Sequence, residues 1–333
     1  MDMDRNIRAY PDIGEMAFGN RGRWVVSVFM NLELYLVATG FLILEGDNLH
    51  NLLPNVGVKV AGSTIGGKQT FVILVALIIL PTVWVNNLSI LSYISASGVL
   101  ASTIILGSIV WTADGVGFHN KGVLLNWNGI PTALSLYAFC YCAHPVFPTL
   151  YTSMRDRTQF SKVLFVCFSL CTICYASIAV LGYLMFGSSL QSQITLNLPT
   201  NKISSRIAIY TTLVNPISKY ALMVTPIVSA IENQIPPHYS KRLSRVLIRT
   251  TLVLSTVLVA IAVPFFGELM SLVGAFLSVS ASIIFPCLCY LKISGSYKRN
   301  GFERVIISAI VLMGISIAVS GTYVAIQQLI SRM

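Results

Sequence analysis

The feature that most constrains this chain is a series of apolar runs, each about 20 residues long and separated by short polar connectors. A helix of ~20 apolar residues crosses the hydrocarbon core of a bilayer. The chain is 55% hydrophobic and only 10% charged, whereas soluble domains are about 25% charged. A soluble domain of this composition would lack the polar residues to cover its surface. We therefore expect an all-α polytopic membrane protein.

Nine runs are long enough to form transmembrane helices. The strands of a membrane barrel would instead alternate in polarity over ~10 residues, which these continuous runs do not do. The predicted domains are an N-terminal segment over 1–23, a transmembrane domain over 24–328 and a short tail over 329–333. The predicted spans are 24–45, 70–86, 89–112, 130–150, 161–186, 206–231, 246–265, 267–291 and 304–328.

The basic residues predict the orientation of the chain. Most of the 22 Lys and Arg residues lie in the N-terminal segment and in every second connector after it. Cytoplasmic connectors carry the excess of positive charge, so we expect a cytosolic N-terminus and a non-cytosolic C-terminus. Because these bases are dispersed among membrane spans, we expect no nucleic-acid partner. They are Arg5, Arg8, Arg21, Arg23, Arg155, Arg157, Lys162, Lys241, Arg242, Arg245, Arg249, Lys292, Lys298, Arg299 and Arg304.

Glu33, Lys219 and His144 are ionisable side chains that lie well inside predicted spans. Glu33 lies about ten residues into the first span, next to the polar Asn31, and Lys219 lies at a similar depth in the sixth. His144 is in the fourth span. Ionisable groups at this depth are costly and usually mark function. The alternatives are a structural ion pair or, for Lys219, a side chain that reaches the interface.

The fourth span has the composition of an interrupted helix. Pro145 and Pro148 each remove a backbone donor, and the stretch before them is aromatic and polar. Transporters bind substrate where a membrane helix unwinds and exposes its backbone, although a proline kink alone is also common. The stretch predicts a binding cavity lined by Tyr137, Phe139, Cys140, Tyr141 and His144.

Prolines and small residues mark two further spans. The sixth span contains Pro216 and Pro226 on either side of Lys219, and we expect it to be interrupted as well. In the eighth span, Gly274, Ser278 and Ser282 recur every four residues. Small residues on one face let membrane helices approach closely, so we interpret this face as a packing surface.

No set of residues predicts catalysis or a bound metal. The seven cysteines all lie in apolar segments, where free cysteine behaves as a small hydrophobic residue. His50, His119 and His238 are isolated, and His144 is followed by prolines rather than by a spaced carboxylate. The pattern therefore argues against a membrane enzyme, and we expect no cofactor and no metal site. A sensor with the same fold but no flux stays open.

Several stretches together resemble the amino acid/auxin permease family, in particular its vacuolar amino-acid transporter branch in plants. Their order and spacing carry the resemblance, which covers nearly the whole chain. The stretches are 10–19 (YPDIGEMAFG), 40–48 (GFLILEGDN), 142–148 (CAHPVFP) with Ser153 and Met154, 218–222 (SKYAL) with Pro226, 264–267 (PFFG) and 273–276 (VGAF).

The resemblance implies a LeuT-like inverted-repeat fold. The family usually has eleven spans, and its opening Tyr-x-Asp-Ile-Gly stretch follows the second. That stretch begins here at Tyr10, so we expect the nine spans to match family spans three to eleven. The first of the family's two broken helices is then absent, and the second corresponds to the stretch from Tyr137 to His144.

The implied activity is secondary active transport of small neutral amino acids, coupled to protons, in a vacuolar or other endomembrane or in the plasma membrane. The alternatives are a truncated non-transporting form and an amino-acid sensor. The expected partners are the amino acid, protons and the bilayer. The candidate substrate-binding residues are Asn31, Tyr137, Phe139, Cys140, Tyr141 and His144, and the candidate coupling residues are Glu33 and Lys219.

Overall fold

A computed structural model describes residues 7, 9–54, 58–60, 63–84, 88–118, 123, 125–232, 241–294 and 301–332. Arg5, Arg8, Lys298 and Arg299 of the orientation argument, and the connector 233–240, lie outside the described residues. Within these residues the regular secondary structure is helical, apart from one small antiparallel hairpin of β1 (Val58–Val60) and β2 (Ser63–Ile65).

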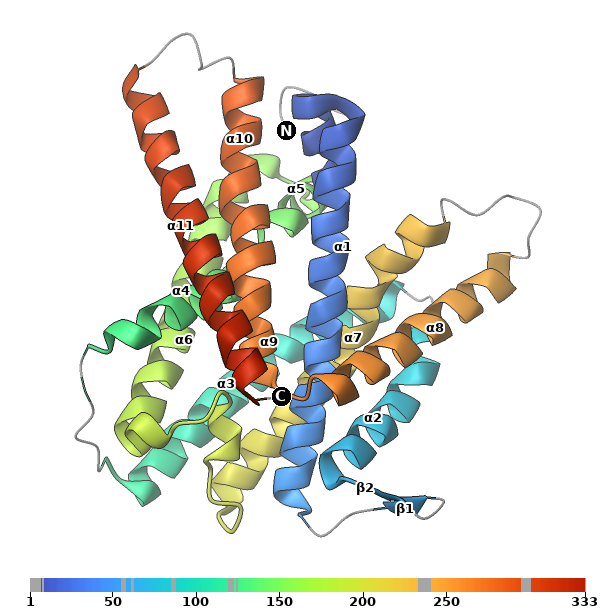
Figure 1. Cartoon of the computed structure of the whole chain (residues 1–333), viewed down its shortest axis with the longest axis vertical. Coiled ribbons are helices and arrows are strands. Elements are labelled where there is room, and N and C mark those ends of the chain that lie inside the picture. The colour runs from blue at the N-terminus through green and yellow to red at the C-terminus, as the bar shows by residue number, and fades with distance from the viewer. Residues whose placement is uncertain are drawn as a thin grey trace. The chain divides into compact units, whose positions relative to one another are not determined.

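The helices follow in chain order, and Figure 1 labels the longer ones. They are α1 (Tyr10–Leu52), α2 (Gly67–Trp84), α3 (Leu88–Val116), η1 (Trp127–Gly129), α4 (Ile130–Cys140), η2 (His144–Val146), α5 (Phe147–Ser153), η3 (Arg157–Gln159), α6 (Phe160–Phe186), η4 (Gly187–Ser189), η5 (Ile194–Leu196), α7 (Ile203–Glu232), α8 (Lys241–Ala262), α9 (Phe266–Leu272), the π-helical segments η6 (Val273–Ser278) and η7 (Ser280–Ile284), α10 (Phe285–Ile293) and α11 (Gly301–Arg332).

Seven helical stretches in the described part of the chain have the length and hydropathy needed to cross a bilayer. The predicted spans 130–150 and 206–231 are not among them. The first is divided into the short helices α4 and α5. The second forms the long helix α7, but polar residues such as Asn215 and Lys219 lie near its middle. The protein is thus a polytopic helical membrane protein, while the count of nine spans stays a prediction.

The first helix begins well before the predicted span. Pro11 lies in the first turn of α1 and suits a helix start. The backbone N–H that proline lacks would have no helical partner in the first turn. The helix is interrupted at Gly19, whose φ of 66° and ψ of −159° are not helical. A positive φ of this kind is readily adopted only by glycine. The chain then continues as one helix to Leu52, seven residues beyond the predicted end.

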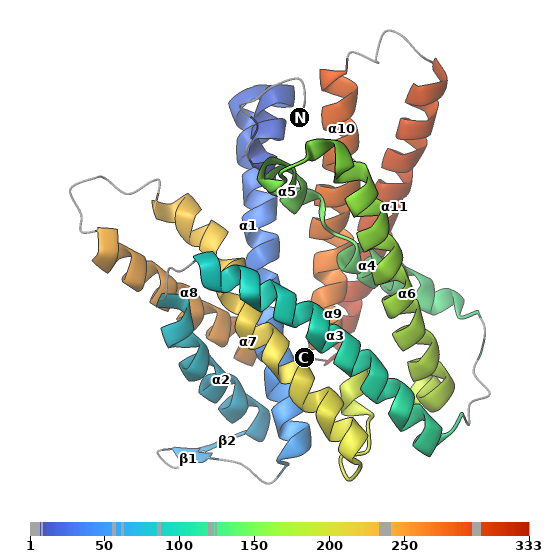
Figure 2. The ribbon, with the colours of Figure 1, turned by 180° about the vertical axis from the view of Figure 1, so that it is seen from behind.

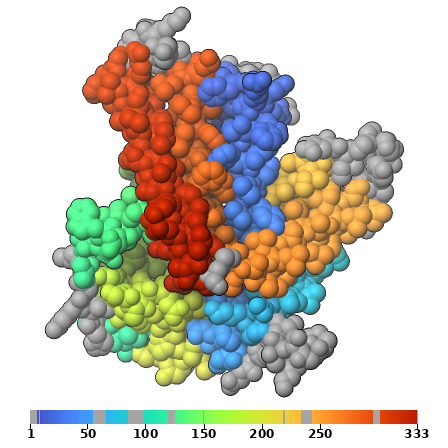
Figure 3. Space-filling view, viewed as in Figure 1, coloured from blue at the N-terminus to red at the C-terminus, as the bar shows by residue number. Residues whose placement is uncertain are grey.

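The chain forms two compact units, which are described separately. Unit 1 contains residues 1–34, 125–167 and 267–333, and unit 2 contains 35–124 and 168–266. In unit 1, α11 packs against α4, η6 and η7. The outer side of α11 carries exposed large apolar residues such as Phe302, Val305 and Val319, as expected of a helix that faces lipid. Figure 3 shows α11 beside α10 on the surface of this unit.

Three helices of unit 1 meet at Ser135 of α4. Side-chain atoms added at Gly274 or at Gly321 would overlap the carbonyl oxygen or the hydroxyl of Ser135, respectively. Ser135 itself is fully buried, and its hydroxyl donates to the carbonyl of Pro131. Close approach of membrane helices through small residues maximises van der Waals contact. The prediction that Gly274 lies on a packing face is confirmed.

In unit 2, α7 is the central helix. It lies against α3, as Figure 2 shows, and against α2 and α8. A hydroxyl pair joins α3 to α7, with Thr112 and Ser204 2.8 Å apart, and a second joins α7 to α8, with Tyr220 and Thr256 2.6 Å apart. All four side chains are buried. Such pairs satisfy polar groups that lipid would leave without partners.

The prediction that the sixth span is interrupted was wrong. Helix α7 is continuous, with Pro216 and Pro226 inside it. Threonine hydroxyls donate to carbonyls near these prolines, from Thr212 to Ala208 and from Thr225 to Ala221. These bonds do not replace the lost ones, because the missing proline N–H groups leave other carbonyls, those of Thr212 and Leu222, without their helical donor. Membrane helices tolerate such prolines where neighbouring helices pack against them.

Candidate functional site

The predicted break in the fourth span is present and lies within unit 1. Helix α4 ends at Cys140, and the residues up to Ala143 are not helical before the short turn η2. Pro145 cannot donate to the carbonyl of Tyr141, and its ring disfavours a helical conformation in the preceding residue. The backbone therefore leaves the helix at the point where the sequence places its aromatic and polar residues.

Cys142, in the middle of the break, is held by side chains from two other helices. Ser282 of η7 donates a hydrogen bond to its sulfur, with Oγ and Sγ 2.9 Å apart. The same thiol lies near the carboxyl of Glu33 in α1. Glu33 is buried and accepts a hydrogen bond from the hydroxyl of Ser278. The break, α1 and the π-helical segments thus meet in one cluster, which we call the Glu33 cluster.

The π-helical segments place these serines toward the break. A π-helix has a wider turn than an α-helix and occurs mostly at functional sites. Here Pro286 lacks the N–H that would bond to the carbonyl of Ala281 in a π-helical pattern. The hydroxyl of Tyr10 donates to that carbonyl instead, at 2.6 Å. The hydrogen bond from Tyr10, at the start of α1, thus supports the π-helical backbone around Ala281 from a distant part of the sequence.

Two predicted site residues carry buried atoms without a partner among the described residues. The amide nitrogen of Asn31 donates to Ser27 at 3.2 Å, while its oxygen Oδ1 is unpaired. The Nδ1 atom of His144 is also unpaired, and its ring packs against Phe147 with centroids 4.8 Å apart. Buried polar atoms normally find a partner, so such atoms are available to a ligand.

The aromatic residues of the break are only partly buried. The rings of Tyr137 and Tyr141 lie 4.9 Å apart, and Tyr137 is 58% exposed. Cys140 is exposed as well. Phe139 packs with its Cβ against the backbone of Gly274. All six predicted substrate residues belong to unit 1. Five of them lie on the break or in the turns beside it, and Asn31 lies in α1. No described contact joins the six into one closed pocket.

Lys219, the other predicted coupling residue, lies in unit 2. It is half-buried in α7 beside Asn215, and both side chains lie against Gly98 of α3. The lysine Cε is 3.4 Å, and the Asn215 oxygen 3.2 Å, from the position that a side chain at Gly98 would occupy. Neither ion pair formed by described residues of unit 2 involves Lys219. A pairing of Lys219 with Glu33 stays a prediction, because the two residues belong to different units.

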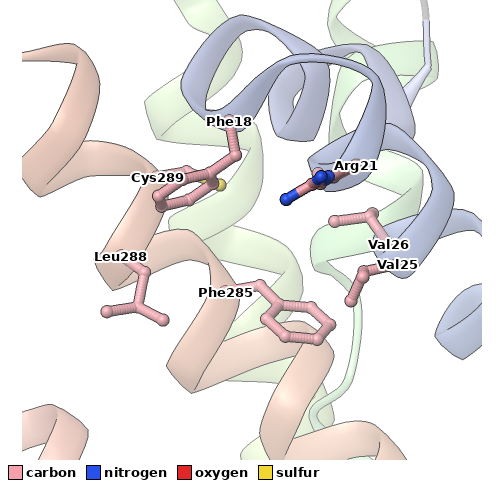
Figure 4. A pocket seen from close by; sticks show the side chains of 8 residues that line it. Phe18, Arg21, Val25, Val26, Phe285, Leu288 and Cys289 are labelled. Atoms are coloured by element: carbon pink, nitrogen blue, oxygen red, sulfur yellow. The ribbon is translucent and has the colours of Figure 1, made fainter.

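A separate pocket of about 240 Å³ lies between the start of α1 and α10 in unit 1. Figure 4 shows the apolar side chains of Phe18 and Phe285 beside Arg21. Ligand sites usually measure about 300–1,000 Å³ and hold several converging polar groups, so this pocket is a poorer candidate than the break. Its lining is Phe18, Arg21, Gly22, Val25, Val26, Phe285, Leu288 and Cys289, none of them a predicted site residue.

Sequence reasoning missed two groups of polar residues. Ser278 and Ser282 were interpreted only as packing residues, but they donate to Glu33 and Cys142. Glu45 was only the last residue of the first predicted span and was given no role. It is fully buried, since α1 continues to Leu52. The continued helical spacing of apolar residues after Glu45 was the available signal.

Comparison with known proteins agrees with a transporter. The family described as "Transmembrane amino acid transporter protein" matches residues 1–327. The amino acid transporter AVT1I of Arabidopsis thaliana is 60% identical over 333 residues, which are 99% of this chain and 82% of that relative. AVT1J of the same plant is 61% identical, over 100% of this chain and 79% of the relative. The vesicular GABA transporter of Caenorhabditis elegans is 26% identical, over 97% and 67%.

The long apolar helices define the class, a polytopic integral membrane protein. The chain belongs to the transmembrane amino acid transporter family. This is a family of transporters and not of enzymes, and its relation to the plant transporters confirms the resemblance found in the sequence.

Proposed function

We propose that this protein is a secondary active transporter that moves small neutral amino acids across a membrane and is coupled to protons. The proposal takes the amino-acid substrate from the family and from the printed names of the relatives. The main structural support is the break after Cys140, with the unpaired Asn31 oxygen and His144 nitrogen in the same unit.

The chemistry of the break suits a zwitterion. An amino acid offers an ammonium group, which needs acceptors, and a carboxylate, which needs donors. The Asn31 oxygen is an acceptor, and unwound backbone can supply both kinds of group. The partly exposed rings of Tyr137, Phe139 and Tyr141, with Cys140, would contact the side chain of the substrate and limit its size.

Glu33 and Lys219 are the proposed coupling residues of the sequence analysis. Glu33 lies in the Glu33 cluster, so a change of its hydrogen bonds would act directly on the break. Lys219 lies against α3 at Gly98, where a change in its charge would alter the packing of α7 on α3. Both residues would thereby connect protonation to helix movement, since ionisable groups in transporters commonly serve as proton relays.

We further propose a vacuolar or other internal membrane, with the plasma membrane as the alternative. The support is the resemblance to the vacuolar branch and the vesicular transporter among the relatives. The N-terminus would face the cytosol, because the basic residues gather in the N-terminal segment and in alternate connectors.

Flux measurements on purified protein in liposomes test the proposal. The full chain would be given a panel of labelled neutral, acidic and basic amino acids, with and without an imposed pH gradient and a protonophore. We expect accumulation of small neutral amino acids that the protonophore abolishes. Binding of an amino acid without flux would instead indicate a sensor or a non-transporting form. Accumulation that is unaffected by the protonophore would refute proton coupling.

A further inference from the structure

Glu45 is a buried acid that the proposed mechanism does not use. It lies in the part of α1 that belongs to unit 2, and its side chain is 0% exposed. Neither of its carboxyl oxygens has a hydrogen-bond partner among the described residues. This distinguishes Glu45 from its neighbour Asp47, whose carboxylate forms an ion pair with Lys68 at 2.7 Å.

The surroundings of Glu45 favour an uncharged carboxyl. An ionised carboxylate without partners is strongly disfavoured in a low-dielectric interior, whereas the neutral acid is tolerated. The next residue, Gly46, packs so closely on α2 that a side chain there would lie 2.7 Å from a methyl of Val72. This contact leaves no room for water between the two helices at that position.

A protonated Glu45 would also match an unpaired acceptor one turn away. Asn48 is fully buried, and its nitrogen donates to the Leu44 carbonyl at 2.8 Å and to the Gln193 oxygen at 2.7 Å. The Asn48 oxygen has no partner among the described residues. Residues three apart on a helix lie on the same face, and only the protonated acid has a donor to offer.

A polar chain leads from the surface of unit 2 to this pair. The side chain of Lys68, at the start of α2, is 53% exposed and holds Asp47. Gln193, in the connector after α6, donates to Asp47 at 3.4 Å and accepts from Asn48. The charged and titratable groups along this chain are Lys68 on α2 and Asp47 and His50 on α1. The uncharged side chain of Gln193 joins Asp47 to Asn48.

We propose that Glu45 binds the transported proton. When a conformational change admits water to the Glu45 carboxylate, a hydronium ion gives its proton to the carboxylate and becomes water. Release of the same proton to water on the opposite side of the membrane restores the carboxylate. The proposal rests on proton-coupled transport as proposed above and adds the group that carries the proton.

The test compares wild type with Glu45→Gln in liposomes. Glutamine has the shape of the protonated acid but cannot release a proton. Two rates are measured: accumulation of a labelled neutral amino acid driven by a pH gradient, and exchange of labelled for unlabelled amino acid at equal pH. We expect Glu45→Gln to lose accumulation to the level of protein-free liposomes and to retain exchange. Glu45→Asp, which keeps a titratable group, should recover part of the accumulation.

Glu303→Gln is the matched control. Glu303 lies at the start of α11 and accepts a hydrogen bond from Tyr290, which glutamine can also accept. Both rates should remain at the wild-type level. Infrared difference spectra between acid and alkaline pH supply a readout that does not need transport. The carbonyl band of a protonated, buried carboxylic acid should be present in wild type, absent from Glu45→Gln and shifted in Glu45→Asp.

The outcomes separate this proposal from the proposed function. Wild-type accumulation in Glu45→Gln, or loss of both rates in a folded variant, would overturn the assignment of Glu45. If wild type shows exchange but no gradient-driven accumulation, proton coupling itself fails and Glu45 has no proton to carry. If Glu45→Gln does not fold, the shift of the infrared band between wild type and Glu45→Asp decides, and its absence refutes the proposal.

Discussion

Replacing Gly274 by alanine tests the close packing at the centre of unit 1. A methyl group at this position would lie 2.8 Å from the carbonyl carbon of Ser135 and 3.0 Å from the Cβ of Phe139, and it would overlap the Ser135 oxygen. Favourable carbon–carbon contacts begin at about 3.5 Å. Segment η6 and helix α4 would therefore have to separate, and both are fixed by further contacts with α11.

The expected cost follows from measurements on overpacked cores. Inserting a methyl group into a tightly packed interior destabilises a protein by about 1–3 kcal/mol. One kcal/mol corresponds to roughly 2–4 °C in a domain of 150–250 residues, so we expect the unfolding temperature of Gly274→Ala to fall by several degrees. The measurement is thermal unfolding in detergent, followed by intrinsic fluorescence and by loss of the monodisperse peak in size-exclusion chromatography.

Gly107→Ala is the control for the intrinsic effect of the substitution. Gly107 lies inside α3, and a side chain there would meet no atom within 4 Å. Alanine is favoured over glycine in a helix by about 1 kcal/mol, so this variant should unfold at or above the wild-type temperature. If Gly274→Ala were as stable as Gly107→Ala, the close approach of η6 to α4 would be refuted.

Three further variants test the site and the termini of the helices. Phe139→Ala should change the order of preference among neutral amino acids by about tenfold or more, because one apolar contact commonly discriminates by that factor; an unchanged competition profile would remove Phe139 from the site. Lys219→Met, in a longer relative that carries this lysine, should abolish pH-gradient-driven uptake and leave membrane insertion intact; uptake at the unmutated level would make Lys219 a structural residue. Asp156 accepts hydrogen bonds from the hydroxyl and the backbone N–H of Thr158, and these bonds lower the pKa of the Asp156 carboxyl. The ionised carboxylate therefore stabilises the fold above the ordinary pKa of aspartate. This stabilisation is lost as the pH falls through the lower pKa of the folded state. The unfolding temperatures of wild type and Asp156→Ala should therefore differ at neutral pH and converge in acid, and a difference independent of pH would contradict this assignment.

The interrupted helix shows how far local sequence reaches. Pro145 and Pro148 act on the backbone within one turn, so the break after Cys140 could be predicted without any knowledge of neighbours. The same reasoning failed for Pro216 and Pro226. There, α7 is continuous and packs on three other helices. Whether a proline interrupts a membrane helix thus depends on the neighbouring helices as well as on the proline.

The class of protein and most of its helices follow from the sequence alone, because lipid requires long apolar segments whose backbone groups are satisfied within each segment. Family membership followed from the order of several short stretches and is confirmed by the relatives. The environments of Glu33 and Glu45, by contrast, depend on the tertiary structure. Glu33 is paired with Ser278 from a segment 245 residues away, and the wider turns there are supported by Tyr10. Glu45 is buried because α1 continues past it and packs on α2 through Gly46. Burial and hydrogen bonding are properties of contacts between distant segments, and the residue type at one position does not contain them.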